Sequence, residues 1–299
     1  MLNNIKSKFS IKDLENLSGI KAHTIRIWEK RYNILTPKRT ETNIRYYDVD
    51  SLRKLLNITL LHRHGYKISK ISTFPEDKIP TLVSEIVSRK SAGHHAINAF
   101  KVAMMNFDPA MFHQTYNVLL SEKSFREIFN EVVIPLMEDV GILWQSGTIT
   151  PAHEHFITNL IAQKVMINLE KVQATSGITK DRVFVLFLPM NELHELGLMY
   201  VNYEVALHGY RSVYLGESVP MENLREVKNL FDDVVFVSSF TVEPTHSEMQ
   251  DYLERLCDEI VTKDSQLWLL GRMMKDANTK RFPSCVKVFD TIGELVDEL

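Results

Sequence analysis

The pattern of apolar and polar positions changes twice along the 299-residue chain. Between about residues 79 and 176, apolar residues recur at intervals of three and four, which is the spacing of amphipathic helices. From about residue 181, short apolar runs rich in β-branched residues alternate with amphipathic segments of helix length. We therefore predict three domains, at residues 1–78, 79–176 and 181–299.

The first part begins with two short helices. Ser10 is placed to cap the first helix, and a second helix follows over about residues 22–32. The short turn between them contains Gly19 and has the length found in a helix-turn-helix. Extended stretches at residues 34–39 and 44–47 then predict a two-stranded wing. The order of these elements indicates a winged helix-turn-helix.

The second part contains no convincing strand. Its apolar periodicity predicts helices at residues 82–100, 109–121, 124–145 and 151–174. Prolines stand before or at the start of three of these segments, and proline suits the first position of a helix. These observations predict a four-helix bundle.

The third part reads as a sheet with crossover helices. The predicted strands are Val183–Leu188, Ser212–Leu215, Val234–Val237, Leu267–Leu270 and Val286–Phe289. Alternation of such strands with helices predicts a parallel sheet that is covered on both faces. Right-handed crossovers give a flavodoxin-like (Rossmann-like) five-stranded domain, in which ligands bind outside the carboxyl ends of the strands.

Charge is distributed unevenly along the chain. The first 80 residues hold 16 Lys and Arg against 8 Asp and Glu, whereas the remainder holds 19 against 30. A basic end on an acidic body suggests that the first part meets a polyanion, although a solvated charged surface explains charge alone equally well. No secretory signal or membrane span is evident, and two cysteines are too few for a disulfide scaffold. We expect a cytoplasmic protein that does not meet a membrane.

Cationic and polar side chains on the second helix and the wing form the candidate nucleic-acid surface. A helix in the major groove and a wing against the backbone bring base edges and phosphates to the same protein. We expect the contacts to come from Thr24, Arg26, Lys30, Arg31, Arg39, Arg45 and Tyr46. The alternative is a basic helical domain that binds another protein.

The segment FSIKDLENLSGIKAHTIRIWEKRY, followed by LTPKRTETNIRYYDVDSL, resembles the DNA-binding domain of the mercury-resistance-regulator (MerR) family over residues 9–72. The resemblance implies double-stranded operator DNA as a partner. It also implies self-association, because members of the family bind palindromic operators as dimers. The long coiled-coil helix that usually serves dimerisation is not evident here.

An E-x-H-x-x-G motif at residues 192–197 directly follows the first strand of the predicted sheet. A histidine at this end of a strand faces the ligand crevice, and imidazole is a good ligand for a transition metal such as cobalt. Glu192 is placed to hold the other ring nitrogen of His194, and Gly197 would let a bulky cofactor approach the helix backbone. A lone histidine in a loop is, by itself, more often structural.

The spacing of this motif resembles the signature of the cobalamin-binding Rossmann-like domain, which usually has Asp at the first position. The resemblance implies His194 as the lower axial ligand of cobalt, with Glu192 behind it and Gly197 beside it. Members of that family carry an S-x-L element and then a Gly-Gly pair, which leaves room for the nucleotide tail of the cofactor. The matching residues here, and the implied cofactor contacts, are Ser239, Thr241 and Gly271, with Leu270 in place of the first glycine.

Trp144 is followed, after nine residues, by Glu154-His155. This spacing resembles the bundle that caps the upper face of adenosylcobalamin in light-sensing MerR-type repressors. The resemblance implies that Trp144 shields the adenosyl group and that Glu154 and His155 contact it. Gln145 stands where those relatives carry a second histidine for cobalt. A core tryptophan and an acidic helix start are the structural alternative.

We therefore predict a transcriptional regulator, a repressor without enzymatic activity, that senses adenosylcobalamin and forms a homodimer or tetramer. The resemblance implies that light, by breaking the cobalt–carbon bond, changes the oligomeric state, with carotenoid or light-stress genes as typical targets. One alternative, motivated by Leu270, is a regulator that has lost cobalamin and responds to another ligand or a protein. A second is a corrinoid carrier for a methyltransferase, against which the first domain argues.

Overall fold

The computed structural model describes residues 8–40, 42–75, 78–83, 92–145, 147–175, 177–261 and 265–299. The chain divides into two compact units, Met1–Ile161 and Ala162–Leu299, and each is described by itself. The boundaries of the three predicted domains stay a prediction.

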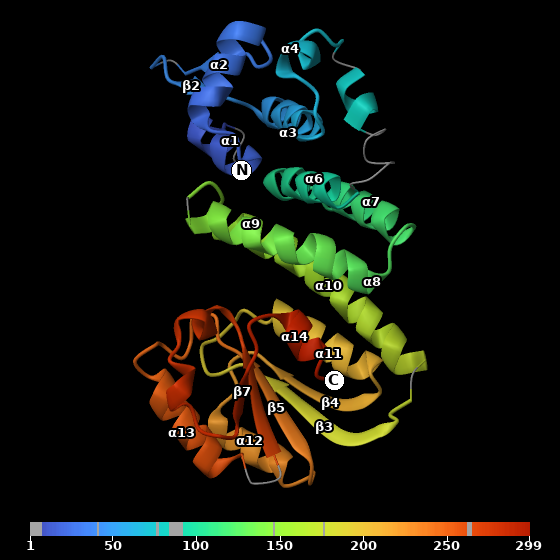
Figure 1. Cartoon of the computed structure of the whole chain (residues 1–299), viewed down its shortest axis with the longest axis vertical. Helices are drawn as coiled ribbons and strands as arrows, with labels where there is room; N and C mark the ends of the chain where they lie inside the picture. Colours follow the sequence, from blue (N-terminus) through green and yellow to red (C-terminus); the bar gives the residue numbers. More distant parts are fainter. Residues whose placement is uncertain are drawn as a thin grey trace, which may run out of the picture. The chain divides into compact units, whose positions relative to one another are not determined.

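The winged helix-turn-helix occupies the first part of the first unit (Figure 1). Its elements are α1 (Ile11–Ser18), α2 (Ala22–Tyr32), β1 (Lys38–Arg39), β2 (Arg45–Tyr46), α3 (Val49–Arg63) and α4 (Ile68–Ile71). The Ser10 hydroxyl accepts a hydrogen bond from the Asp13 N–H at 3.1 Å and so satisfies a donor at the start of α1. Gly19 ends this helix at φ +73°, a left-handed conformation that glycine adopts without strain. β1 and β2 pair antiparallel, so the predicted fold is confirmed.

The helical bundle follows in the chain. Its segments are α6 (Ala92–Asn106), α7 (Pro109–Leu120), α8 (Phe125–Ile128), a π-helical turn (Phe129–Val133), α9 (Ile134–Gln145) and α10 (Pro151–Thr175). The segments from α8 to α9 follow one another without a break and together form the third predicted helix. The first predicted helix, at residues 82–100, overlaps residues 84–91, which lie outside the described residues. The predicted bundle is confirmed, and α10 continues past Ile161 into the second unit.

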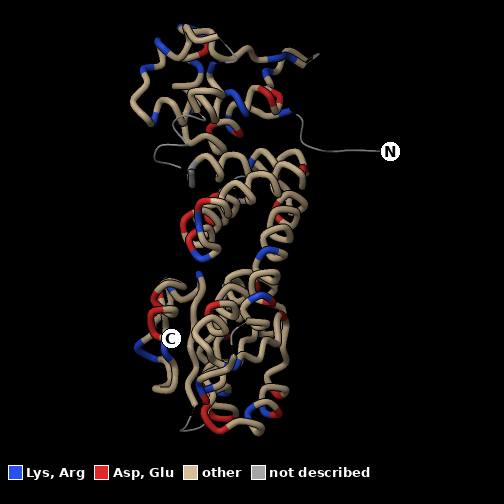
Figure 2. The backbone as a smooth tube through the Cα atoms, turned by 90° about the vertical axis from the view of Figure 1, so that its right-hand side faces the viewer, with Lys and Arg blue, Asp and Glu red and all other residues tan. Residues whose placement is uncertain are grey.

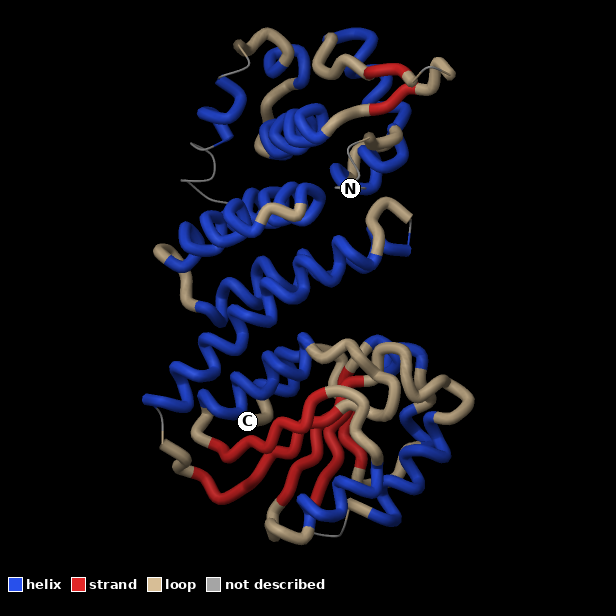
Figure 3. The backbone as a smooth tube through the Cα atoms, turned by 180° about the vertical axis from the view of Figure 1, so that it is seen from behind, coloured by secondary structure: helices blue, strands red, loops and turns tan. Residues whose placement is uncertain are grey.

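A five-stranded sheet forms the centre of the second unit (Figures 1 and 3). Its strands are β3 (Lys180–Phe187), β4 (Tyr210–Gly216), β5 (Val234–Ser239), β6 (Ser265–Leu270) and β7 (Val286–Val288). They are all parallel and lie in the order β4-β3-β5-β6-β7. This is the flavodoxin-like order, and it confirms the prediction.

Both faces of the sheet are buried, as the continuous apolar runs predict. Alternate side chains of one strand enter different cores: Phe184 and Leu186 join one cluster, whereas Val183 and Val185 join the other. The first cluster is closed by α11 (Leu196–Leu207) and α14 (Ile292–Val296), and the second by α12 (Met221–Lys228) and α13 (Met249–Glu259). Figure 1 shows the two helix pairs on opposite sides of the sheet.

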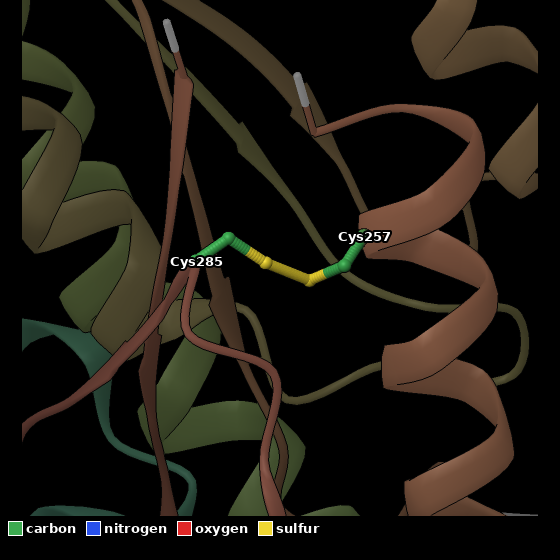
Figure 4. The surroundings of a disulfide bond; sticks show 2 residues. All are labelled: Cys257 and Cys285. Atoms are coloured by element: carbon green, nitrogen blue, oxygen red, sulfur yellow. A yellow bond between two sulfur atoms is a disulfide. The ribbon is translucent and has the colours of Figure 1, made fainter. Parts of the chain in front are cut away.

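The two cysteines form a disulfide, which the sequence analysis did not predict (Figure 4). Cys257 lies on α13 and Cys285 directly precedes β7, and their Cα atoms are 6.7 Å apart. The residues are 28 positions apart in sequence, so only the packing of α13 beside the β6–β7 edge brings them together. Across the described ranges, no helix combines the length and the apolar character needed to span a membrane.

Candidate functional site

The cationic side chains predicted to meet nucleic acid lie on the surface of α2 and the wing. Arg26, Lys30, Arg31, Arg39 and Arg45 are exposed, whereas Thr24 and Tyr46 are partly buried. The opposite face of α2 enters the core through Ile25 and Trp28, which fixes the direction of the exposed face. Figure 2 marks Lys and Arg positions along this part of the chain.

Two exposed apolar side chains accompany these cations. Ile27 on α2 is 47% exposed, and Ile44 in the wing turn is 64% exposed. Apolar side chains at such positions suit contact with the thymine methyl group. The sequence analysis did not include these two residues, because residue type alone does not separate an exposed isoleucine from a core isoleucine.

Internal contacts hold the wing in shape. Arg39 donates from Nη1 to the Asn43 side-chain oxygen at 2.7 Å, across the turn in which Asn43 has φ +64°. At the base of the wing the Tyr47 hydroxyl donates to Glu29 of α2. The wing is thereby fixed to the recognition helix, so cations on both elements are presented as one surface.

The second candidate site lies in the loop after β3. The Glu192 carboxylate oxygen Oε1 is 2.6 Å from His194 Nδ1 and also accepts hydrogen bonds from the N–H groups of Leu193 and His194. Because a carboxylate can only accept, the proton of the imidazole is held on Nδ1. Nε2 is then the nitrogen whose lone pair suits a metal. The side chain of His194 is 56% exposed, while that of Glu192 is completely buried.

The other oxygen of Glu192 joins a second loop to this one. Its Oε2 accepts hydrogen bonds from three consecutive N–H groups after β5, those of Thr241, Val242 and Glu243, at 2.9, 2.6 and 3.0 Å. Burial by itself raises the pKa of the Glu192 carboxyl, but the hydrogen bonds from His194 and from the backbone outweigh it and lower the pKa to about 2. The carboxylate is therefore charged, and it fixes both loops and the imidazole.

Three exposed apolar side chains lie in the same two loops. We call Met190, Leu193 and Val242 the apolar rim; each is about half exposed or more. Exposed apolar groups beside a fixed polar ligand are typical of a site that binds a large, flat organic molecule. The sequence analysis missed the rim, although Leu193 lies within the E-x-H-x-x-G motif and Met190 lies two residues before it.

The remaining residues predicted for this site are near the strand ends. Gly197 is the second residue of α11, and a Cβ atom there would lie 3.6 Å from Ile292 of α14. Ser239 is buried at the end of β5, and Thr241 contributes its N–H to Glu192. Gly271 has φ +115°, and a Cβ atom there would come within 2.4 Å of the Phe240 carbonyl oxygen.

The predicted residues of the bundle lie at the end of α9 and the start of α10. The indole of Trp144 is 55% exposed, which excludes the alternative of a core tryptophan. Glu154 Oε2 is 3.3 Å from His155 Nε2, and the Thr158 hydroxyl donates to the other oxygen of Glu154. The side chain of Gln145 lies outside the described part of the structure.

A winged helix-turn-helix with an exposed basic surface, a helical bundle, and a flavodoxin-like sheet with a carboxylate-held histidine define a DNA-binding regulator with a ligand-binding module. Comparison with known families agrees. Residues 9–76 match the MerR HTH family regulatory protein, and residues 96–167 match a B12 binding domain.

Relatives match over most of the chain. The HTH-type transcriptional repressor CarH of Myxococcus xanthus is 30% identical over 270 residues, which cover 88% of each chain. The HTH-type transcriptional repressor CarA of the same organism is 24% identical over 259 residues, 83% of this chain and 82% of that one. This chain therefore belongs to the family of MerR-type transcriptional repressors that carry a B12 binding domain. In fold it resembles the Methanosarcina barkeri monomethylamine corrinoid protein, with a TM-score of 0.58 and 15% identity over 69% of this chain and 97% of that one.

Proposed function

We propose that this repressor binds operator DNA through α2 and the wing, and that it senses adenosylcobalamin by coordinating cobalt through His194. The observation that carries the proposal is the contact of 2.6 Å between Glu192 and the exposed His194 at the carboxyl end of β3. A buried carboxylate behind an exposed imidazole is the arrangement that orients metal-binding histidines.

The residues of this loop suit an axial ligand. Glu192 keeps the proton on Nδ1 and prevents rotation of the ring, so Nε2 is directed to one position. The apolar rim supplies a surface on which the face of a corrin ring can lie. When bound, adenosylcobalamin would supply a cobalt–carbon bond that light can break.

For the bundle, we propose that Trp144, Glu154 and His155 contact the adenosyl group. The exposed indole offers a flat apolar surface, and the adjacent Glu154–His155 pair offers polar groups for a ribose or an adenine. These roles rest on the W-x9-E-H spacing and on the exposure of Trp144.

For regulation, we propose that the chain binds palindromic DNA as a homodimer or a tetramer in the cytoplasm, without enzymatic turnover. A ligand changes DNA affinity only to the extent that it binds one oligomeric state more tightly than another. Loss of the adenosyl group in light would then change the preferred state.

The test is the visible spectrum of the purified protein after incubation with adenosylcobalamin in the dark and gel filtration. We expect a retained chromophore with an axial-histidine spectrum, which His194→Ala abolishes while DNA binding is unchanged. His208→Ala, in the same unit but at the opposite end of α11, is the control and should keep the spectrum. An eluate without chromophore would favour a regulator of another signal.

A gel shift with DNA from upstream of the gene that encodes this chain distinguishes a regulator from a corrinoid carrier. The repressor should retard this fragment at moderate salt, whereas a corrinoid carrier for a methyltransferase should not. The exposed cations of α2 and the wing favour the regulator.

A further inference from the structure

Leu270, the last residue of β6, is buried in the core between the sheet and the helices α11 and α14. Its side chain is 5% exposed, and its cluster includes Leu198 of α11, Leu295 of α14 and Phe289. The side chain therefore fills this core at the carboxyl end of the sheet. This is the end of the sheet at which the Glu192–His194 loop lies.

Ser239 is the direct neighbour of Leu270 across the sheet. The two residues are paired in the register of β5 and β6, and the Leu270 carbonyl accepts the N–H of Phe240 at 2.9 Å. Val235 and Val237 of β5 enter the same core as Leu270, and by the alternation of a strand Ser239 has this orientation too. The serine expected to meet the nucleotide tail thus lies against a leucine.

The helices α11 and α14 pack against each other over the core that Leu270 enters. Gly197 of α11 approaches Ile292 of α14 so closely that an added Cβ would already be in van der Waals contact. Leu188, directly after β3, and Leu198 are both completely buried in the same cluster. A heteroaromatic base that entered this core beside Ser239 would meet the packed side chain of Leu270, and displacing a packed core side chain is costly.

We propose that Leu270 closes the space for the nucleotide tail, so that the site recognises the corrin ring and its axial ligand but not the lower nucleotide. This inference rests on the proposed coordination by His194. The ligand class is then all corrinoids, independent of the lower nucleotide, and it includes cobinamides, which have no lower nucleotide. A tail that stays in water adds no buried area and hence no affinity.

The experiment compares adenosylcobalamin with adenosylcobinamide in the dark, by absorbance and tryptophan-fluorescence titration of the full chain. The wild type should bind the cobinamide at least as tightly as the cobalamin. Leu270→Gly should tighten cobalamin binding by about tenfold, which is about 1.4 kcal/mol, and leave cobinamide binding within about threefold. Leu270→Ala should shift the ratio in the same direction by less, and it serves if the glycine variant does not fold.

Leu269→Ala is the matched control, because Leu269 is buried on the same strand but on the opposite face of the sheet. This variant should lose stability without changing the ratio of the two affinities. A wild type that prefers cobalamin by more than about tenfold would overturn the inference, as would an unchanged ratio in both Leu270 variants. If the wild type binds neither corrinoid, the proposed function itself fails.

Discussion

Asn16 of α1 donates a hydrogen bond from Nδ2 to the hydroxyl of Thr148, with 2.8 Å between the two atoms. Thr148 is completely buried and lies in the segment between α9 and α10, which begins after Trp144 and ends before Glu154. The first helix of the DNA-binding domain is thus joined to the segment between α9 and α10, the two helices whose ends carry the proposed adenosyl contacts. A rearrangement of that segment would act directly on α1.

We predict that Asn16 and Thr148 are energetically coupled. Asn16→Ala and Thr148→Val should each destabilise the chain, and the double variant should lose about 1 kcal/mol less than the sum, because one hydrogen bond is removed only once. Urea denaturation of the four proteins measures this coupling. Asn168→Ala on α10, combined with Asn16→Ala, is the control pair and should be additive.

The proposed contact of the wing with DNA predicts how operator binding depends on salt. Arg45→Ala should weaken operator binding, and the slope of log K against log salt should become less steep by about 1, because one phosphate contact is lost. Arg225→Ala on α12, an exposed cation of the second unit, should leave the slope unchanged. A gel shift at several salt concentrations measures both. An unaltered slope for Arg45→Ala would count against the wing as a phosphate contact.

The contacts of Asp48 at the start of α3 predict that the stability of the fold decreases at acid pH. Asp48 caps this helix, and Lys38 of the wing lies 2.7 Å from its carboxylate. The hydrogen bond from Lys38 and those from Ser51 lower the pKa of Asp48 from 3.8 to about 2. Because the pKa of Asp48 is lower in the folded chain than in the unfolded chain, its charged carboxylate stabilises the fold at pH values above the unfolded pKa. This contribution is lost as the pH falls from about 4 toward 2.

Asp48→Asn keeps the cap but not the ionisation, so its unfolding free energy should change less with pH in this window than that of the wild type. Thermal unfolding between these pH values measures the difference. Asp50→Asn is the control, because the carboxylate of Asp50 is almost fully exposed. If the unfolding free energies of the wild type and of Asp48→Asn changed with pH in the same way, the Lys38 contact would not stabilise the charged form of Asp48.

Sequence patterns were sufficient to predict the strands of the sheet and to find the Glu192–His194 motif. Five apolar runs gave five strands, because parallel strands are buried on both faces and carry few polar residues. Right-handed crossovers then limited the strand orders to a few, of which the flavodoxin-like order was the one predicted. The motif was visible because its members are close in sequence and follow a strand directly.

Contacts between distant segments were beyond this reasoning. The disulfide depends on the packing of α13 against the edge of the sheet. The hydrogen bonds that Glu192 accepts from the N–H groups of residues 241–243 depend on contact between two loops. Backbone donors carry no sequence signal at all. The burial of Leu270 beside Ser239 likewise follows from register, which sequence alone does not give for parallel strands.

The two glycines of the candidate site should respond differently to alanine. At Gly271 an added Cβ would come within 2.4 Å of the Phe240 carbonyl, and φ is +115°, which an L-residue adopts only with strain. Gly271→Ala should therefore destabilise the second unit by about 1–3 kcal/mol and disturb the loop that Glu192 holds. At Gly197 the nearest atom would be Ile292 Cδ1 at 3.6 Å, an ordinary contact in a helix, so Gly197→Ala should be neutral or stabilising. Urea denaturation of the two variants separates these cases, and a Gly197→Ala variant that folds normally but loses the adenosylcobalamin spectrum would assign Gly197 to ligand contact instead of helix packing.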